Sequence, residues 1–194
     1  MNQSFFALIS RMRYIGRWGL MRNSLQENIQ EHSHMVAVIS HSLAVIGREI
    51  YGKNCDPEKC AAVALFHDAS EILTGDLPTP IKYHDDAIKN SYKEIEHKAN
   101  MRLLELLPSE LRASYEPLLI QEDSEISAYV KAADKLSAYI KCIEERKAGN
   151  NEFKSAEAQI LGTLKENPLP EVRYFIDNFI PAFELTLDEL GTMN

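Results

Sequence analysis

The sequence predicts an all-α fold, a single-domain bundle of helices. Apolar residues recur at three- and four-residue steps along most of the chain, which is the period of a helix packed on a core. No alternating apolar–polar stretch of useful length competes as a β-strand. The 194 residues are 45% apolar, and their 8 Gly and 8 Pro form no linker-like stretch. We therefore expect one domain over residues 1–194.

The first half of the chain predicts three helices. An amphipathic helix is expected over residues 3–15, where Gly16 ends it and residues 17–19 form a turn. Residues 32–50 carry the second apolar stripe. The third helix is expected to begin at Asp56-Pro57, an N-cap followed by proline at the first helical position, and to run to about Leu73.

The second half predicts an ordered loop and then four helical segments. Residues 74–80 hold Gly and two Pro and are expected to be non-helical. Long helices are predicted over residues 84–106, ending near Pro108, and from about Ser124 to Lys147. Two further segments complete the chain, and Pro181 is expected to kink or split the last one.

Charge and cysteine content restrict the possible partners. The formal net charge is -8 and the sequence pI is about 5.3, which argues against a nucleic-acid polymer or an anionic membrane as partner. A small phosphorylated substrate remains possible, because a bound dication and an arginine make a local positive site. The apolar run at residues 5–9 is too short for a signal or a membrane span. We expect a cytoplasmic protein whose three cysteines are reduced thiols.

Three ionisable residues stand in an apolar part of the third predicted helix. Glu71 follows His67 by four residues and Asp68 by three, so a helix would place it on their face. Such groups are expensive to bury unless they are paired or bind a metal, and an imidazole beside a carboxylate suits a transition metal. The alternative is a chance His-Asp dipeptide near a helix surface.

His32 is the best candidate for a further ligand. It shares a helix face with Val36 and Ile39, which should meet the core, whereas His34 points elsewhere. Taken alone, a histidine at this position is more often a core residue satisfied by a backbone carbonyl.

Asp134 is the remaining candidate ligand. Its small neighbours Ala132 and Ala133 would let another helix approach closely. The alternative places it on a solvated face, paired with Lys131 or Lys135.

The order His32, then His67-Asp68, then Asp134, each on a separate predicted helix, resembles the HD-domain superfamily of phosphohydrolases. Further stretches resemble the bacterial 5'-deoxynucleotidases of that superfamily and extend the likeness over nearly the whole chain. These stretches are Arg17-Trp18, Glu31-His32-Ser33, His67-Asp68-Ala69-Ser70-Glu71, and residues 74–80, 131–134 and 149–153.

The resemblance implies an HD-type helical domain that releases phosphate from deoxyribonucleoside 5'-monophosphates. It also implies one divalent transition metal, with Co²⁺ or Mn²⁺ expected, and a homodimer. The implied metal ligands are His32, His67, Asp68 and Asp134. The implied catalytic residues are Glu71, Asp68 and Arg17. The implied substrate-binding residues are Arg17, Trp18, His32, Asp68, Asp76, Leu77, Pro78 and Thr79.

These implied roles are physically sensible. A bound dication lowers the pKa of a coordinated water, and a guanidinium such as that of Arg17 can fork onto two phosphate oxygens. Glu71 could act on the proton of the attacking water or of the leaving 5'-oxygen, and the residues leave both open. Trp18 beside the sugar would exclude a 2'-hydroxyl by shape. Without the resemblance, Arg17 could cap a helix C-terminus, Trp18 could be a core residue and Asp76 a turn residue.

Two other functions compete. Another HD phosphohydrolase could act on nucleoside triphosphates, cyclic dinucleotides or alarmones, and a di-iron form would need extra histidines such as His84 or His97. A non-catalytic metal-binding interaction module is the second alternative. It needs neither Glu71 nor Arg17, so their presence favours an enzyme.

Overall fold

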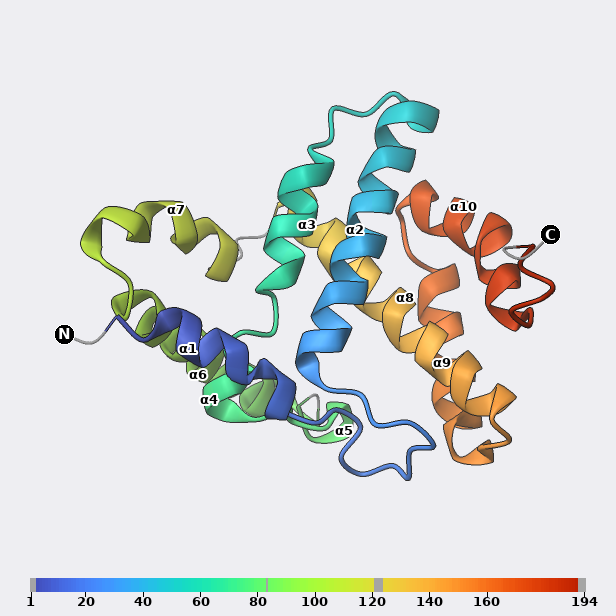
Figure 1. Ribbon diagram of the computed structural model, residues 1–194, viewed down its shortest axis with the longest axis horizontal. Helices are drawn as coiled ribbons and strands as arrows, with labels where there is room; N and C mark the ends of the chain where they lie inside the picture. Colours follow the sequence, from blue (N-terminus) through green and yellow to red (C-terminus); the bar gives the residue numbers. More distant parts are fainter. Residues whose placement is uncertain (1–2, 83, 121–123, 192–194) are drawn as a thin grey trace.

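The computed structural model describes residues 3–82, 84–120 and 124–191, and within these ranges every regular element is helical (Figure 1). An isolated bridge between Gly16 and Asn28 is the β-type contact recorded there. The predicted all-α class is confirmed. The elements are α1 (Phe5–Ile9), η1 (Ser10–Tyr14), α2 (Ile29–Tyr51), α3 (Pro57–Leu65), α4 (Glu71–Thr74), α5 (Thr79–Lys82), α6 (Asp86–Glu105), α7 (Ser109–Leu119), α8 (Glu125–Lys147), η2 (Asn151–Phe153), α9 (Lys154–Lys165), α10 (Pro170–Asn178) and η3 (Ile180–Glu184).

Helices α2, α3 and α8 form the centre of the molecule (Figure 1). Helices α9 and α10 lie on one side of them, and α1 and α4 to α7 lie on the other. The larger hydrophobic cluster joins the central helices to α9, α10 and η3. A smaller cluster fills the space between α1, α6 and α7. Among the described helices, none combines the length and apolar content that a membrane span requires.

Local sequence signals fix the ends of the two long central helices. The Asn28 side chain caps α2 by accepting from the backbone N–H groups of Gln30 and Glu31. Gly52, with φ of 64°, ends the same helix in the left-handed conformation. Ser124 caps α8 by accepting from the Ser127 N–H. These caps fix where α2 begins and ends and where α8 begins.

The predicted helix from Asp56 to Leu73 is wrong in its middle. Its start is confirmed, because Asp56 caps α3 and Pro57 is the first helical residue. However, α3 ends at Leu65, and residues 66–70 form a turn before α4. The ring of His67 takes the carbonyl of Ala64 at 2.7 Å, so this acceptor no longer serves a regular helix. The fully buried Ala69 then packs in the smaller cluster, away from the axis of α3. His67 and Asp68 therefore lie on a turn and not on a helix.

Two other expectations also differ from the structure. The predicted loop over residues 74–80 ends early, because Thr79 begins α5. Pro80 is the second residue of α5, where its missing N–H leaves no helix bond unmade. Helix α7 was not predicted, since it contains Pro117 and buries only Leu119 among its residues. The predicted end of α8 at Lys147 and the split of the last segment near Pro181 are confirmed.

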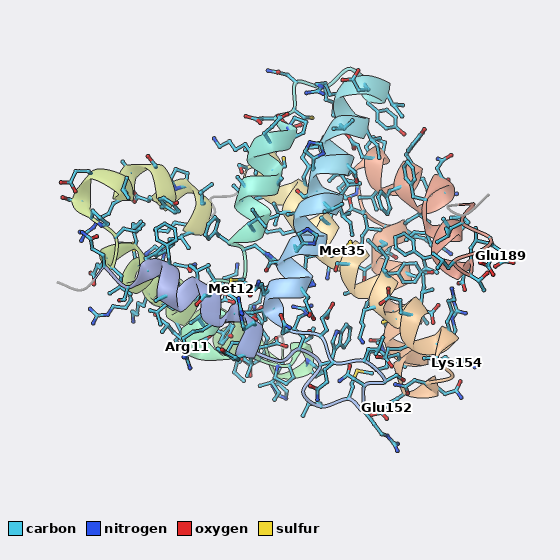
Figure 2. The ribbon with its side chains drawn as sticks, viewed as in Figure 1. Arg11, Met12, Met35, Glu152, Lys154 and Glu189 are labelled. Carbon is cyan, nitrogen blue, oxygen red and sulfur yellow. The ribbon has the colours of Figure 1, made fainter. Side chains whose placement is uncertain are left out.

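The irregular loop of residues 16–28 is anchored on α8 by Glu145. This carboxylate is 1% exposed and accepts from the Ser24 N–H at 2.8 Å and from Asn150 Nδ2 at 2.8 Å. Lys141 Nζ lies 2.5 Å from the same carboxylate and 2.6 Å from the Leu25 carbonyl. At the edge of the molecule, Glu152 accepts from the N–H of Arg22 at 3.1 Å (Figure 2). The loop is therefore held in place without regular secondary structure.

Gly47 lies where side chains of α8 and α10 pack tightly against α2. A Cβ at this position would lie 2.7 Å from Tyr129 Oη and 2.8 Å from Glu171 Oε1. Both side chains are buried and fixed, because Tyr129 donates to Glu171 at 2.9 Å and Lys53 pairs with Glu171 at 2.6 Å. The absence of a side chain at Gly47 is thus a packing requirement.

We expect Gly47→Ala to lower the free energy of unfolding by about 1–3 kcal/mol, because overpacking forces fixed neighbours to shift. Gly162→Ala on the exposed face of α9 is the matched control, since no atom lies within 4 Å of its added Cβ. It should raise the free energy of unfolding by about 0.5–1 kcal/mol through better helix propensity. Urea unfolding of both variants measures the change in the free energy of unfolding relative to the parent. Equal changes in the two variants would contradict the packing argument.

The anchor at Glu145 should make stability depend on pH. Burial opposes its ionisation, but bonds from Lys141, Asn150 and Ser24 outweigh burial and lower its pKa from 4.5 to about 2. Its stabilisation is therefore present above pH 4.5 and is lost as pH falls through about 2. Glu145→Gln should be less stable than the parent by about 1–3 kcal/mol at pH 7, and this gap should narrow between pH 4.5 and 2. Urea unfolding of the parent and Glu145→Gln across that pH range tests this prediction. A difference in the free energy of unfolding that stays constant with pH would show that the Glu145 carboxylate is not the titrating anchor.

Candidate active site

Three predicted ligands converge where the two hydrophobic clusters meet. His32 comes from the first turn of α2, and His67 and Asp68 come from the turn after α3. One potential ligand atom from each of the three lies within 4.8 Å of the others. The His32 side chain is fully buried and that of His67 is 8% exposed. The break in the predicted helix is what turns Asp68 toward His32.

The rings of both histidines are oriented by bonds to their Nδ1 atoms. His67 Nδ1 donates to the Ala64 carbonyl at 2.7 Å, because a carbonyl can only accept. His32 Nδ1 lies 3.2 Å from the Ser137 hydroxyl. The buried Nε2 atoms of both rings have no hydrogen-bond partner within the described part of the chain. In neutral His67, Nε2 therefore carries the lone pair, and His32 has the same arrangement when its Nδ1 donates to Ser137. This is the arrangement of a metal-binding histidine with an outer partner.

Asp134 adjoins this group from α8. Its Oδ1 lies 3.0 Å from His32 Nε2 and 4.0 Å from a terminal nitrogen of Arg17. Ala132 and Ala133 beside it are buried, as its small neighbours predicted. The structure thus brings His32, His67 and Asp68 into one cluster and places Asp134 at its edge.

The two carboxylates are held in their charged form. Burial opposes the ionisation of Asp68, but the neighbouring imidazoles and Arg17 keep its pKa well below the usual range. Burial likewise opposes the ionisation of Asp134, and contact with His32 outweighs it and lowers the pKa to about 2. For His67, the Asp68 carboxylate outweighs burial and raises the pKa, so a metal would compete with a proton at this ring. Two anionic carboxylates and two imidazoles form a donor set that fits a divalent transition metal.

Arg17 connects these carboxylates to the loop of residues 16–28. Its Nη1 donates to Asp68 at 3.3 Å and its Nε donates to Glu27 at 3.1 Å. Burial disfavours its charge, but the surrounding carboxylates of Asp68, Asp134, Glu27 and Asp76 outweigh burial and raise its pKa further. Arg17 is thus a permanently charged group at the cluster, not a helix cap.

Glu71 is the first residue of α4 and is buried at 5% exposure. Burial, then the charges of Asp68 and Asp76, raise its pKa to about 9. Its Oε2 has no hydrogen-bond partner in the described structure. A carboxyl group that holds a proton at neutral pH beside a charged cluster is typical of a general acid or base.

A cavity of about 580 Å³ opens beside the cluster, a volume suited to a small organic ligand. Arg17 and Asp134 belong both to its wall and to the cluster. Among the other predicted substrate residues, Trp18, Asp76, Pro78 and Thr79 line it, whereas His32, Asp68 and Leu77 do not. The lining residues that the sequence did not suggest are Gly19, Leu20, Met21, Pro80, Lys135, Ala138, Ala156, Gln159 and Ile160.

Trp18 is held in an unusual backbone conformation at this cavity. Its φ is 59°, the one positive value for a non-glycine residue in the described ranges. Its indole Nε1 donates to Glu27 at 2.9 Å, and its ring packs on Phe153 with centroids 5.2 Å apart. Trp18 is therefore part of the cavity wall and not a residue of the main core.

Sequence reasoning missed two residues that support the cluster. Ser137 stands three residues after Asp134 on α8, and this helical spacing was a usable signal. Glu27 lies in irregular chain ten residues after Arg17, and no pattern pointed to it. His84 and His97 are exposed and are not part of the potential metal-binding group of His32, His67 and Asp68 found among the described residues. Their positions disfavour a di-iron centre built on them.

Comparison with known proteins agrees with this geometry. The family model described as 5'-deoxynucleotidase YfbR-like matches residues 4–183. A 5'-deoxynucleotidase of Erwinia tasmaniensis is 48% identical over 98% of this chain and 97% of its own length. One from Vibrio cholerae is 50% identical over 96% of this chain and 97% of its own.

Solved structures share the fold. An HD-domain phosphohydrolase of Listeria innocua has a TM-score of 0.81 at 23% identity, covering 93% of this chain and 88% of that one. The HD phosphohydrolase DatZ of cyanophage S-2L, bound to dA and one catalytic Zn²⁺, has a TM-score of 0.60 at 21% identity, covering 94% and 96%. The fold is that of the HD-domain phosphohydrolases, and the chain belongs to the YfbR-like 5'-deoxynucleotidase family.

Proposed function

We propose that this protein is a metal-dependent 5'-deoxynucleotidase, which hydrolyses deoxyribonucleoside 5'-monophosphates to deoxyribonucleosides and inorganic phosphate. One observation carries the proposal. Two buried imidazoles present unpaired Nε2 atoms beside Asp68, and this cluster meets a nucleotide-sized cavity at Arg17 and Asp134. The names of the Erwinia and Vibrio relatives support the same activity.

His32, His67, Asp68 and Asp134 would hold one divalent transition metal. A dication bound there supplies a water of lowered pKa and offsets negative charge on the phosphoryl oxygens. Imidazole and carboxylate donors suit Co²⁺ and Mn²⁺, the ions expected from the resemblance, and also Zn²⁺, which the cyanophage enzyme carries.

The remaining residues bind the substrate and move a proton. Arg17 turns its planar guanidinium to the phosphate, since it is charged and already lies between the cluster and the cavity. Glu71 handles the proton of the attacking water or of the leaving 5'-oxygen. Asp76 accepts a hydrogen bond from the sugar, and Trp18 forms the wall that a 2'-hydroxyl would meet. Pro78 and Thr79 complete this wall, and Leu77, which precedes them in the chain, does not line the cavity.

We also propose that the chain works as one domain, as a cytoplasmic homodimer. The site takes residues from α2, the turn after α3, α4 and α8, which supports a single functional unit. The three cysteines are free thiols, as suits a reducing compartment. Met35 and Val38 on α2 are 37% and 52% exposed and offer apolar surface to a second copy. Light scattering of the purified protein would test the dimer directly.

A phosphate-release panel tests the proposed activity. Deoxy- and ribonucleoside monophosphates, triphosphates and cyclic dinucleotides are each assayed with added Co²⁺, Mn²⁺ or Zn²⁺. We expect turnover of deoxyribonucleoside monophosphates and its loss on chelation. Preferred release from triphosphates or cyclic dinucleotides would favour another HD phosphohydrolase. Absence of turnover on every nucleotide would favour a non-catalytic metal-binding module.

Glu71→Ala and Asp68→Ala should separate proton transfer from metal binding. Glu71→Ala should keep the metal and lower kcat by about 10²–10⁴-fold, because it removes only the proton carrier. Asp68→Ala should lose both metal and turnover, because it removes a ligand and leaves the imidazoles without their anion. Metal analysis of the dialysed proteins and kcat measurements are compared. A Glu71→Ala enzyme with a near-normal rate would show that the proton assignment is wrong.

Arg17→Lys should keep a positive charge but lose the fork that two phosphate oxygens require. We expect kcat/KM for the nucleotide to fall by about tenfold in Arg17→Lys and by about 10²-fold in Arg17→Ala. Metal content should stay at the parent level in both variants, because Arg17 is not a ligand. Loss of metal in the lysine variant would instead indicate a structural role.

A further inference from the structure

We infer that Glu27 is a positioning residue that orients the phosphate-binding arginine and the sugar-facing tryptophan through a single carboxylate oxygen. The inference rests on the proposed function, since it assigns Glu27 to the same substrate site. Glu27 does not line the cavity, but it contacts two residues that do, Arg17 and Trp18.

One oxygen atom joins the two side chains. Glu27 Oε2 accepts from Arg17 Nε at 3.1 Å and from Trp18 Nε1 at 2.9 Å. The side chains of Glu27 and Arg17 are only 16% and 13% exposed, so water competes little for these bonds. Because Nε is engaged by Glu27, the two terminal nitrogens of Arg17 are left facing Asp68 and Asp134. Glu27 therefore fixes the plane of the guanidinium at the cluster.

The backbone of Trp18 gives an independent reason for this role. A tryptophan at φ of 59° is in the left-handed region, which is strained for a residue with a Cβ. Such a conformation persists only where surrounding contacts enforce it. The Glu27 bond to the indole is one such contact, and the packing on Phe153 is another. These two contacts hold the indole at the cavity despite the backbone strain.

The backbone of the loop does not depend on the Glu27 carboxylate. The Arg17 N–H donates to the Glu27 carbonyl at 2.9 Å, and the Ile29 N–H donates to the Ile15 carbonyl at 3.0 Å. Glu145 anchors the middle of the loop from α8. Loss of the Glu27 side chain should therefore release two functional side chains and leave the loop in place.

A common anchor has a consequence for substrate choice. Arg17 is proposed to bind the phosphate and Trp18 to exclude a 2'-hydroxyl, and the two are adjacent in the chain. Because both side chains bond to the same Glu27 oxygen, the distance between the Arg17 guanidinium and the Trp18 indole is fixed. Removal of this acceptor should weaken turnover of deoxynucleotides and also reduce discrimination against ribonucleotides.

The test uses Glu27→Ala, Glu27→Gln and the control Glu152→Ala in the full chain. Glu152 also bonds to this loop, at Arg22, and within the described residues no hydrogen bond or ion pair joins its carboxylate to Arg17 or Trp18. With metal added, Glu27→Ala should lower kcat/KM for deoxynucleotides about 10–100-fold and the deoxy-to-ribo ratio at least about threefold. Glu27→Gln keeps one acceptor oxygen and should lie between Glu27→Ala and the parent. Glu152→Ala should match the parent in both measurements, and metal content should be unchanged throughout.

A second readout needs no nucleotide. Trp18 is the only tryptophan in the chain, so intrinsic fluorescence reports on this side chain alone. Glu27→Ala should shift its emission to longer wavelength and increase its quenching by acrylamide, while Glu152→Ala should do neither. If Glu27→Ala does not fold, Glu27→Gln carries the same comparison at smaller amplitude.

The inference is overturned if Trp18 stays as shielded in Glu27→Ala as in the parent, or if the deoxy-to-ribo ratio is unchanged. It is also overturned if Glu152→Ala reproduces the effects, since that would indicate general loosening of the loop. A parent protein without nucleotide turnover would refute the proposed function instead. The fluorescence comparison would still decide whether Glu27 positions Trp18.

Discussion

The site depends on the burial of His32, a residue of α2, against α8. A buried imidazole needs a partner for each nitrogen, and Ser137 on α8 supplies one for Nδ1. That bond fixes the ring plane and directs Nε2 to the edge where Asp134 and Asp68 approach. The close packing around Gly47, further along α2, keeps the two helices in this register. The core and the functional cluster are therefore parts of one packing arrangement.

The turn at residues 66–70 interrupts the helical hydrogen bonds after α3 and brings His67 and Asp68 next to His32. Residues on a continuous helix would have placed His67 and Asp68 about 100° apart. In the turn, the Ala64 carbonyl binds the His67 ring, and Asp68 Oδ2 lies 3.2 Å from His67 Nε2 and 3.7 Å from His32 Nε2. The buried Ala69 compensates by joining the smaller hydrophobic cluster. Both imidazoles can thereby face a single carboxylate.

The sequence predicted much of this arrangement and failed where tertiary contacts override local signals. The all-α class and the long helices follow from periodicity and caps, and the cost of burying charge marked His67 and Asp68 as a candidate site. The grouping of His32 and Asp134 with them was implied by the resemblance to the HD-domain superfamily. The interruption at residues 66–70 could not be read from an apolar stretch, because it depends on a side chain taking a helix carbonyl. Helix α7 buries too little to show a clear stripe. Glu27 acts through irregular chain, where residue spacing carries no spatial information.

Charge explains why so acidic a protein can take a phosphate monoester at this site. Asp68 and Asp134 are ionised, and Glu27 and Asp76 add further carboxylates around a single arginine. A phosphate dianion placed beside Asp68 alone would be repelled strongly in so buried a setting. A divalent ion held by His32, His67, Asp68 and Asp134 would neutralise the charge of its two carboxylate ligands. The terminal nitrogens of Arg17 would then be free to turn from Asp68 toward the phosphate while its Nε stays on Glu27. The carboxylates of Asp68 and Asp134, which alone would repel the phosphate, would thus form the cation site that attracts it. The bond from Arg17 Nε to Glu27 would keep Arg17 in place while its terminal nitrogens change partner.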